Sequence, residues 1–134
     1  MPSPAQLRRL KAAAKTAAGR AYAPYSKFHV GAAVLMESGK IFAGCNVENA
    51  SYGLCNCAER TAIFSAVAAK ERKLKCVVVY TPTQEATAPC GACRQVIFEF
   101  GPKTRVISFC AGGDQIDARI TALLPAAFGP ASLA

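Results

Sequence analysis

Hydrophobic residues along the 134-residue chain recur with a helical period in some segments and form short apolar runs in others. Between Ser3 and Gly19 the apolar positions follow helical spacing. A serine-proline start and a glycine stop are typical of helix ends, so this segment predicts a first helix. Residues 22–28 are rich in aromatic and turn-forming residues and predict an ordered loop. Two apolar segments, residues 29–36 and Ile41–Cys45, then flank a Glu-Ser-Gly-Lys turn and predict a β-hairpin.

The rest of the chain alternates predicted helices with predicted strands. One helix is expected to begin at Asn56, a favourable N-cap residue, and to run to about Ala69. A second helix follows Pro89 and continues through Phe100. Since each helix then serves as a crossover between neighbouring strands, the chain predicts a mixed sheet flanked by helices. The remaining elements are strands over residues 75–80, 104–110 and 115–120, and a short helical piece over residues 121–128.

Length and composition narrow the class of protein. With 134 residues and 52% hydrophobic content, the chain suits one domain, residues 1–134, with an ample core. No apolar run approaches the ~20 residues that span a bilayer, so no membrane association is expected. No signal-type apolar segment is visible either, and the seven cysteines then indicate metal ligands or reduced thiols in a cytoplasmic protein. The acid-free stretch before Glu37 leaves organelle targeting as the weaker alternative.

The formal net charge of +8 suggests a nucleic-acid partner at first sight. Most of the basic residues, however, lie beside alanines on the first predicted helix or cluster at the turn before residues 75–80. Such positions are typical of solvated surface, and no RNA- or DNA-binding motif accompanies them. The sequence therefore predicts no nucleic-acid partner.

Three cysteines are placed for metal chemistry. Cys57 lies at the start of one predicted helix, and Cys90 and Cys93 lie at the start of the next, where unpaired N–H groups and the helix dipole stabilise thiolates. Cys90 and Cys93, spaced i and i+3, share one helix face. Thiolates suit zinc, and three protein ligands leave the fourth position open, as in catalytic zinc sites. Glu59 lies on a different side of the turn from Cys57, so it can face the open position without binding the ion.

A fourth cysteine leaves an alternative open. Cys55 together with the other three would form a closed four-thiolate site, typical of a small structural zinc module that binds a partner or nucleic acid through its basic surface. In that case the Cys55→Ser variant releases zinc and unfolds. An open catalytic site keeps its zinc after the same change.

Four motifs occur in this chain in the same order as in one enzyme family. From about Tyr22 to Phe128 the chain resembles the small, homotetrameric, zinc-dependent cytidine deaminases, and Cys-Ala-Glu followed by Pro-Cys-x-x-Cys matches the zinc deaminase signature. The motifs are Asn46-Val47-Glu48-Asn49-Ala50, Cys55-Asn56-Cys57-Ala58-Glu59-Arg60-Thr61-Ala62, Pro89-Cys90-Gly91-Ala92-Cys93-Arg94-Gln95-Val96 and Leu123-Leu124-Pro125.

The resemblance implies a three-layer α/β/α cytidine deaminase-like fold with a mixed sheet of about five strands. It implies one Zn2+ per subunit, bound by Cys57, Cys90 and Cys93. The implied reaction is hydrolysis of free cytidine and 2'-deoxycytidine to uridine and 2'-deoxyuridine plus ammonia, in pyrimidine salvage. Zinc acidifies the water that attacks C4, and Glu59 would carry protons from that water to N3 and to the departing amine. Arg60 would donate hydrogen bonds to the thiolates and offset their charge.

Contacts with the substrate likewise come from the resemblance. Asn46 and Glu48 would hold the ribose hydroxyls. The backbone N–H of Ala58 would contact the base carbonyl, and Phe28 would pack against the nucleoside.

The resemblance also implies that Tyr52 and Phe128 reach the pocket from neighbouring subunits of a homotetramer, so that monomers would be inactive. A rival hypothesis is a deaminase that acts on a flipped or unstacked base within RNA or DNA. The short chain and the ribose-type residues Asn46 and Glu48 favour a free nucleoside.

Overall fold

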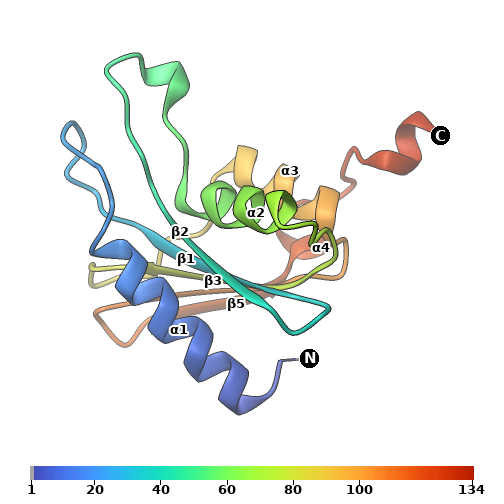
Figure 1. Cartoon of the computed structure of the whole chain (residues 1–134), viewed down its shortest axis with the longest axis horizontal. Helices are drawn as coiled ribbons and strands as arrows, with labels where there is room; N and C mark the ends of the chain where they lie inside the picture. Colours follow the sequence, from blue (N-terminus) through green and yellow to red (C-terminus); the bar gives the residue numbers. More distant parts are fainter. Residues whose placement is uncertain (1) are drawn as a thin grey trace.

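The computed structural model describes residues 2–134, in which helices cover both faces of a five-stranded sheet (Figure 1). This arrangement confirms the predicted three-layer α/β/α fold with a mixed sheet. None of the described helices combines the length and apolar composition needed to cross a bilayer. The elements are α1 (Pro4–Ala18), β1 (Gly31–Met36), β2 (Ile41–Cys45), the 3-10 turn η1 (Tyr52–Leu54), α2 (Ala58–Ala68), β3 (Leu74–Thr81), α3 (Gly91–Phe100), β4 (Arg105–Cys110), β5 (Gln115–Arg119), α4 (Ile120–Leu123) and the 3-10 turn η2 (Pro130–Leu133).

The strands lie in the order β2-β1-β3-β4-β5. Among the strands that the structure describes, β3 and β4 pair in parallel and the other neighbouring pairs are antiparallel. The prediction that each helix joins neighbouring strands holds for α3, which links β3 to β4. It is wrong for α2, because β1 lies between β2 and β3 and α2 must cross over it. Since β1 is antiparallel to both neighbours, the carboxyl ends of β2, β3 and β4 all lie at one edge of the sheet.

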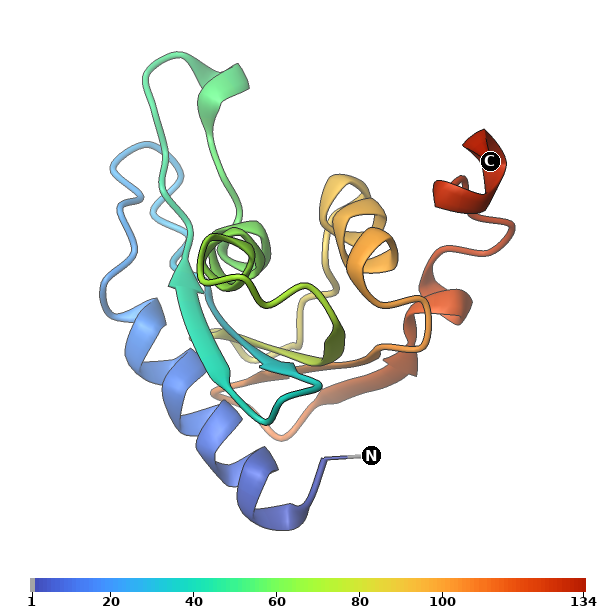
Figure 2. The same ribbon diagram turned by 45° about the vertical axis from the view of Figure 1, so that its right-hand side comes forward.

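The two faces of the sheet are covered unequally. Helix α1 packs alone on one face, while α2, α3 and α4 cover the other (Figures 1 and 2). In β1 the side chains alternate between two cores, with Ala33 and Leu35 under α1, and Val34 and Met36 under α2 and α3. A strand buried on both faces is apolar at every position, which explains why β1 forms a continuous hydrophobic run.

Some predicted boundaries shift in the structure. The first strand begins at Gly31 instead of residue 29, and the residues before it are held largely by the side chain of Asn46. The N-cap of α2 is Cys57, not Asn56, whose amide donates to the Thr61 hydroxyl at 3.0 Å. The helix predicted over residues 121–128 is limited to α4, since Pro125 cannot continue it.

Candidate metal centre and catalytic cleft

The three predicted metal ligands come from the starts of two helices. Cys57 is the N-cap of α2, Cys90 is the N-cap of α3, and Cys93 lies in the first turn of α3. After β2 the chain makes an excursion over residues 48–55. Asn56 then lies beside Val47 again, and the two residues exchange two backbone hydrogen bonds of 2.9 Å that close the excursion. Helix α2 therefore starts close to the end of β2, and α3 starts after β3. Both starts lie at the sheet edge where these parallel-running strands end.

The sulfur geometry fits a tetrahedral metal ion. The Sγ atoms of Cys57, Cys90 and Cys93 all lie within 4.8 Å of one another, and those of Cys57 and Cys90 are 3.7 Å apart. Zinc–sulfur bonds of ~2.3 Å at tetrahedral angles place two sulfurs roughly 3.8 Å apart. The donor set and its spacing therefore suit Zn2+, with three protein ligands and room for a fourth.

Hydrogen bonds stabilise negative charge within this sulfur cluster. The pKa of Cys57 falls from its ordinary value of 9.0 to about 5, because Cys93 and Arg60 donate to its sulfur. The distance from Arg60 Nη2 to Cys57 Sγ is 3.3 Å. The pKa of Cys93 rises because its thiol donates to Cys57 and is buried. The pKa of Arg60 also rises, through its hydrogen bond to Cys57, so the guanidinium carries a permanent charge beside the thiolates.

Glu59 is a buried carboxyl group next to the cluster. It lies in the first turn of α2 and is only 4% exposed. Burial raises its pKa from 4.5 to about 7, and the negative charge of Cys57 adds to the shift. Its carboxylate is not part of the three-sulfur group, yet it lines the same cleft. Glu59 is therefore a buried acid at the cleft that lies outside the three-sulfur group.

A cleft of about 310 Å3 opens above these groups. This volume lies at the lower end of the range for small-molecule sites. The predicted substrate contacts Phe28, Asn46, Glu48 and Ala58 come together here from three separate segments. The full lining consists of Ser26, Phe28, Val30, Asn46, Glu48, Cys57, Ala58, Glu59, Val79, Thr87, Ala88 and Cys90.

Other predicted residues lie outside the cleft of their own chain. Tyr52 packs edge-on against Tyr25, with ring centroids 5.9 Å apart, and is 72% exposed on the 48–55 excursion. Phe128 is 59% exposed near the C-terminus. Cys55 is turned toward Asn49, whose backbone N–H lies 3.3 Å from its sulfur, so residues 2–134 do not form the alternative four-thiolate site.

Sequence reasoning missed Ser26, Val30, Val79, Thr87 and Ala88 among the lining residues. The first two flank Phe28 in sequence, and that proximity is the only signal that the sequence carries for them. Val79 belongs to the apolar run of β3 over residues 76–80, where nothing separates a residue at the cleft from one in the core. Arg94, which directly follows the ligand Cys93, donates to two carbonyl groups, those of Pro89 and Leu123, each at 2.8 Å.

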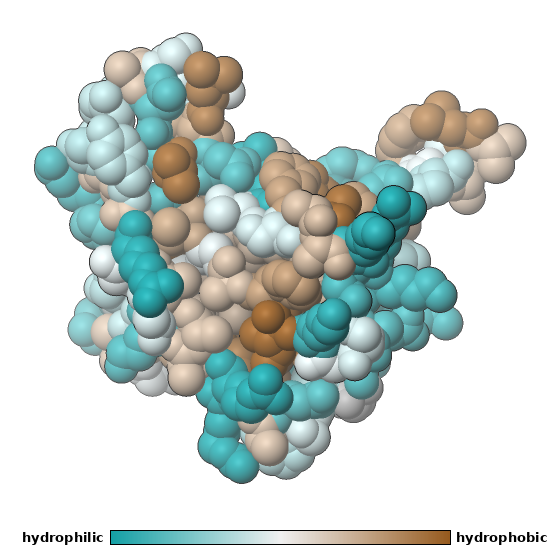
Figure 3. Space-filling view, in the orientation of Figure 1, coloured by the Kyte–Doolittle hydropathy of each residue, from teal (hydrophilic) through white to brown (hydrophobic). Residues whose placement is uncertain are grey.

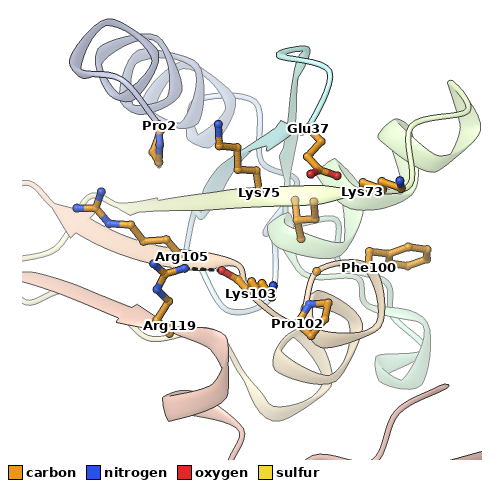
Figure 4. A pocket seen from close by; sticks show the side chains of 11 residues that line it. Pro2, Glu37, Lys73, Lys75, Phe100, Pro102, Lys103, Arg105 and Arg119 are labelled. Carbon is orange, nitrogen blue, oxygen red and sulfur yellow. Dashed lines mark hydrogen bonds between the residues drawn. The ribbon is translucent and has the colours of Figure 1, made fainter. Parts of the chain in front are cut away.

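A larger pocket of about 540 Å3 lies at the opposite end of the sheet, where β3 and β4 begin (Figure 4). Three lysines and two arginines rim it, and both arginines have partners within the protein. Arg119 donates to the carbonyl of Lys103 at 2.8 Å, and Arg105 forms a bidentate pair with Asp117. This pocket has neither the thiols nor the buried acid, so the smaller cleft is the candidate active site.

Comparison with known proteins agrees with the cleft chemistry. Residues 4–109 match the family model described as the cytidine and deoxycytidylate deaminase zinc-binding region. The chain belongs to the cytidine and deoxycytidylate deaminase family. Family membership and the three-sulfur geometry together identify Zn2+ as the cofactor.

Relatives cover almost the entire chain. A cytidine deaminase from Sporosarcina psychrophila is 46% identical over 126 residues, 93% of this chain and 93% of the relative. One from Halalkalibacterium halodurans is 49% identical over 109 residues, 81% of this chain and 83% of that protein. The crystal structure of cytidine deaminase from Burkholderia pseudomallei superposes with a TM-score of 0.86 at 53% identity, covering 90% of this chain and 98% of that one. The predicted family and fold are confirmed.

Proposed function

We propose that this family member hydrolyses free cytidine and 2'-deoxycytidine to uridine and 2'-deoxyuridine plus ammonia, in pyrimidine salvage. The observation that carries the proposal is the buried carboxyl of Glu59 beside three clustered thiols at the base of one cleft. The family includes enzymes for nucleosides and for nucleotides. The lining of this cleft holds two carboxylates, Glu48 and Glu59, and no lysine or arginine. A 5'-phosphate would therefore meet repulsion without compensation, which favours the uncharged nucleoside.

Proton transfer is the role proposed for Glu59. When bound to Cys57, Cys90 and Cys93, zinc supplies a Lewis acid that makes water a nucleophile at neutral pH. Glu59 accepts one proton from the attacking water and delivers it to N3 of the base; it then takes the second proton from the hydroxyl added at C4 and delivers it to the departing amine, as the C4 carbonyl forms and ammonia leaves. One carboxyl group can perform all these transfers because they occur in sequence.

Arg60 balances the charge of the metal ligands. Three thiolates and one Zn2+ leave a net charge of −1, which weakens the metal as a Lewis acid. The guanidinium of Arg60, at 3.3 Å from the sulfur of Cys57, draws electron density from that ligand. Arg60 therefore supports the reaction without contacting the substrate.

The base and the sugar are assigned to opposite walls of the cleft. The backbone N–H of Ala58 is in the first turn of α2, where N–H groups have no acceptor within the helix, so it can donate to the base carbonyl. Asn46 and Glu48 lie on the facing segment after β2 and are proposed to bind the ribose hydroxyls. Phe28 covers the nucleoside from the adjacent loop.

A homotetramer is the proposed assembly. Two segments project from the body of the subunit, the 48–55 excursion and the C-terminal arm (residues 125–134), and both carry hydrophobic surface (Figures 1 and 3). Leu54 is 69% exposed and Leu133 is 79% exposed. Exposed apolar side chains of this size favour contacts with other chains. Tyr52 and Phe128 lie on these segments and are proposed to complete the cleft of a neighbouring subunit.

The seven cysteines are all free, which suits the reducing environment of the cytoplasm, where we place the enzyme.

Loss of cytidine absorbance on adding the purified enzyme is the direct test. Activity should disappear after zinc is removed with a chelator and return when Zn2+ is restored. The Glu59→Gln variant should retain one zinc per subunit and lose activity by several orders of magnitude, since its amide cannot carry protons. Cytidine 5'-monophosphate and cytosine within an oligonucleotide should remain unchanged. Full activity in the zinc-loaded Glu59→Gln variant would contradict the proposed function.

A further inference from the structure

We infer that Ser26 is a positioning residue for nucleoside binding, because its hydroxyl joins Glu48 to the loop that carries Phe28. The inference rests on the proposed function and adds a residue to it. Ser26 does not contact the metal ligands or Glu59. It acts on the sugar side of the cleft through the two groups that it connects.

The carboxylate of Glu48 is held by three donors from a single loop. Its Oε1 accepts the backbone N–H of Tyr25 at 3.0 Å and that of Ser26 at 3.2 Å. Its Oε2 accepts the hydroxyl of Ser26. The Ser26 hydroxyl lowers the pKa of Glu48 below its ordinary value, so the group is an anion at neutral pH. Since a carboxylate has about four acceptor positions, one remains for a ribose hydroxyl.

The same hydroxyl fixes the next part of the loop. Ser26 Oγ accepts the backbone N–H of Phe28 at 3.0 Å while it donates to Glu48. Asn46 binds the loop from its other end, donating to the Phe28 carbonyl at 2.7 Å and accepting from the Val30 N–H at 2.9 Å. Both backbone groups of Phe28 are therefore bound, one through Ser26 and the other through Asn46.

The loop needs this support because its backbone is strained. Lys27, between Ser26 and Phe28, has φ of 61°, a left-handed conformation that residues other than glycine rarely adopt. Such a conformation persists where surrounding contacts enforce it. Without the Ser26 hydroxyl, the backbone of Lys27 can leave the left-handed conformation. Phe28 and Glu48 are then no longer held at fixed positions relative to each other.

The position of Ser26 predicts which kinetic constant changes. The thiols and Glu59 are on α2 and α3, whereas Ser26 and its partners are on the loop before β1 and the segment after β2. Loss of the hydroxyl should therefore weaken substrate binding and leave the chemical step nearly intact. Hydrogen bonds to an ionised acceptor are roughly twice as strong as neutral ones, and we expect KM for cytidine to rise about tenfold in Ser26→Ala.

The test compares Ser26→Ala, Ser26→Thr, Glu48→Gln and the double variant Ser26→Ala/Glu48→Gln, all zinc-loaded. Ser26→Ala should raise KM with kcat within about twofold of the unmodified enzyme, and Ser26→Thr, which keeps the hydroxyl, should restore KM. Because part of the effect of Ser26 passes through Glu48, the double variant should be less impaired than the two single effects combined. Ser65→Ala is the matched control, since it removes an exposed hydroxyl that donates only to the carbonyl of Thr61.

An unchanged KM in Ser26→Ala, a loss confined to kcat, or full additivity with Glu48→Gln would each overturn the inference. If the alanine variant does not fold, Ser26→Cys retains the volume with a weaker donor and serves for the same comparison. Failure of the unmodified enzyme to deaminate cytidine would contradict the proposed function itself. An active enzyme that is insensitive to Ser26 contradicts only the role given to this residue.

Discussion

Replacing Gly44 with alanine should separate the metal ligands from each other without touching any of them. Gly44 lies on β2 directly beneath α2, and a Cβ atom there would be 2.4 Å from the Ala62 nitrogen and 2.8 Å from the Ala58 carbonyl oxygen. Both are backbone atoms, so no side-chain rotation relieves the clash. Restoring an ordinary contact of 3.4 Å requires α2 to move by about 1 Å. Cys57 and Glu59 would move with it, relative to the thiols on α3.

The expected magnitude follows from this displacement. Overpacking of this kind costs about 1–3 kcal/mol of stability, which in a chain of this size lowers Tm by roughly 5–10 °C. A shift of ~1 Å in catalytic geometry costs on the order of 100-fold in rate. We therefore expect Gly44→Ala to fold, to unfold at a lower temperature and to lose about 100-fold in kcat.

Thermal unfolding, zinc content and cytidine turnover measured on the same preparation test this prediction. Gly113→Ala is the control, since a Cβ atom at that position meets nothing within 4 Å. Equal Tm and kcat in Gly44→Ala and the unmodified enzyme would show that the close approach of β2 and α2 does not set the position of the metal ligands.

Three further predictions concern the metal centre and the assembly. Arg60→Gln should keep zinc, measured by atomic absorption, but lose at least about tenfold in kcat because the thiolate charge is no longer offset; unchanged turnover would remove Arg60 from the reaction. Cys55→Ser should retain full zinc content and activity, since this thiol bonds to Asn49 and not to the metal, and zinc loss would revive the closed four-thiolate site. Phe128→Ala should leave zinc content unchanged yet raise KM for cytidine, since this side chain is proposed to complete the cleft of a neighbouring subunit, and an unaltered KM would exclude it from the cleft.

The metal centre was predictable because its chemistry depends on short spacings. Cys90 and Cys93 are three residues apart, and a helix start between Pro89 and Gly91 places both on one face. The interval from Cys57 to Cys90 holds one helix, one strand and one loop, which is enough chain to bring α3 back beside α2. Local propensity and chain length were enough to bring these three thiols together, but the contact that turns Cys55 toward Asn49 was needed to separate the open site from the closed one.

The path of α2 could not be predicted in the same way. Strand β1 separates β2 from β3, and the pattern of apolar residues does not record which strand pairs with which. The N-cap shift from Asn56 to Cys57 has a similar origin. Asn56 is committed to the backbone bridge with Val47 that closes the 48–55 excursion, a contact between segments that propensity does not describe.

The loop before β1 was the least predictable part of the cleft. Residues 22–28 were expected to be ordered, but the sequence gives no sign that Glu48 and Asn46 hold this loop from the end of another strand. Glu48 and Asn46 form hydrogen bonds with backbone groups of the loop. Nearly every residue type carries these backbone groups, so the loop sequence does not show where such bonds form. Ser26 was therefore overlooked even though it lies two residues from Phe28.

The anchoring of α3 by Arg94 has a consequence for how the chain can vary. Its guanidinium reaches the Leu123 carbonyl, which lies just ahead of the C-terminal arm, whereas the arm itself is tied down by the bond from Gln95 to the Phe128 carbonyl at 2.7 Å. Insertions or trimming beyond Pro125 would leave the first attachment whole. The register of the sulfur ligands is thus insulated from changes in the arm, whose own sequence is constrained instead by the contacts proposed for Phe128 with a neighbouring subunit.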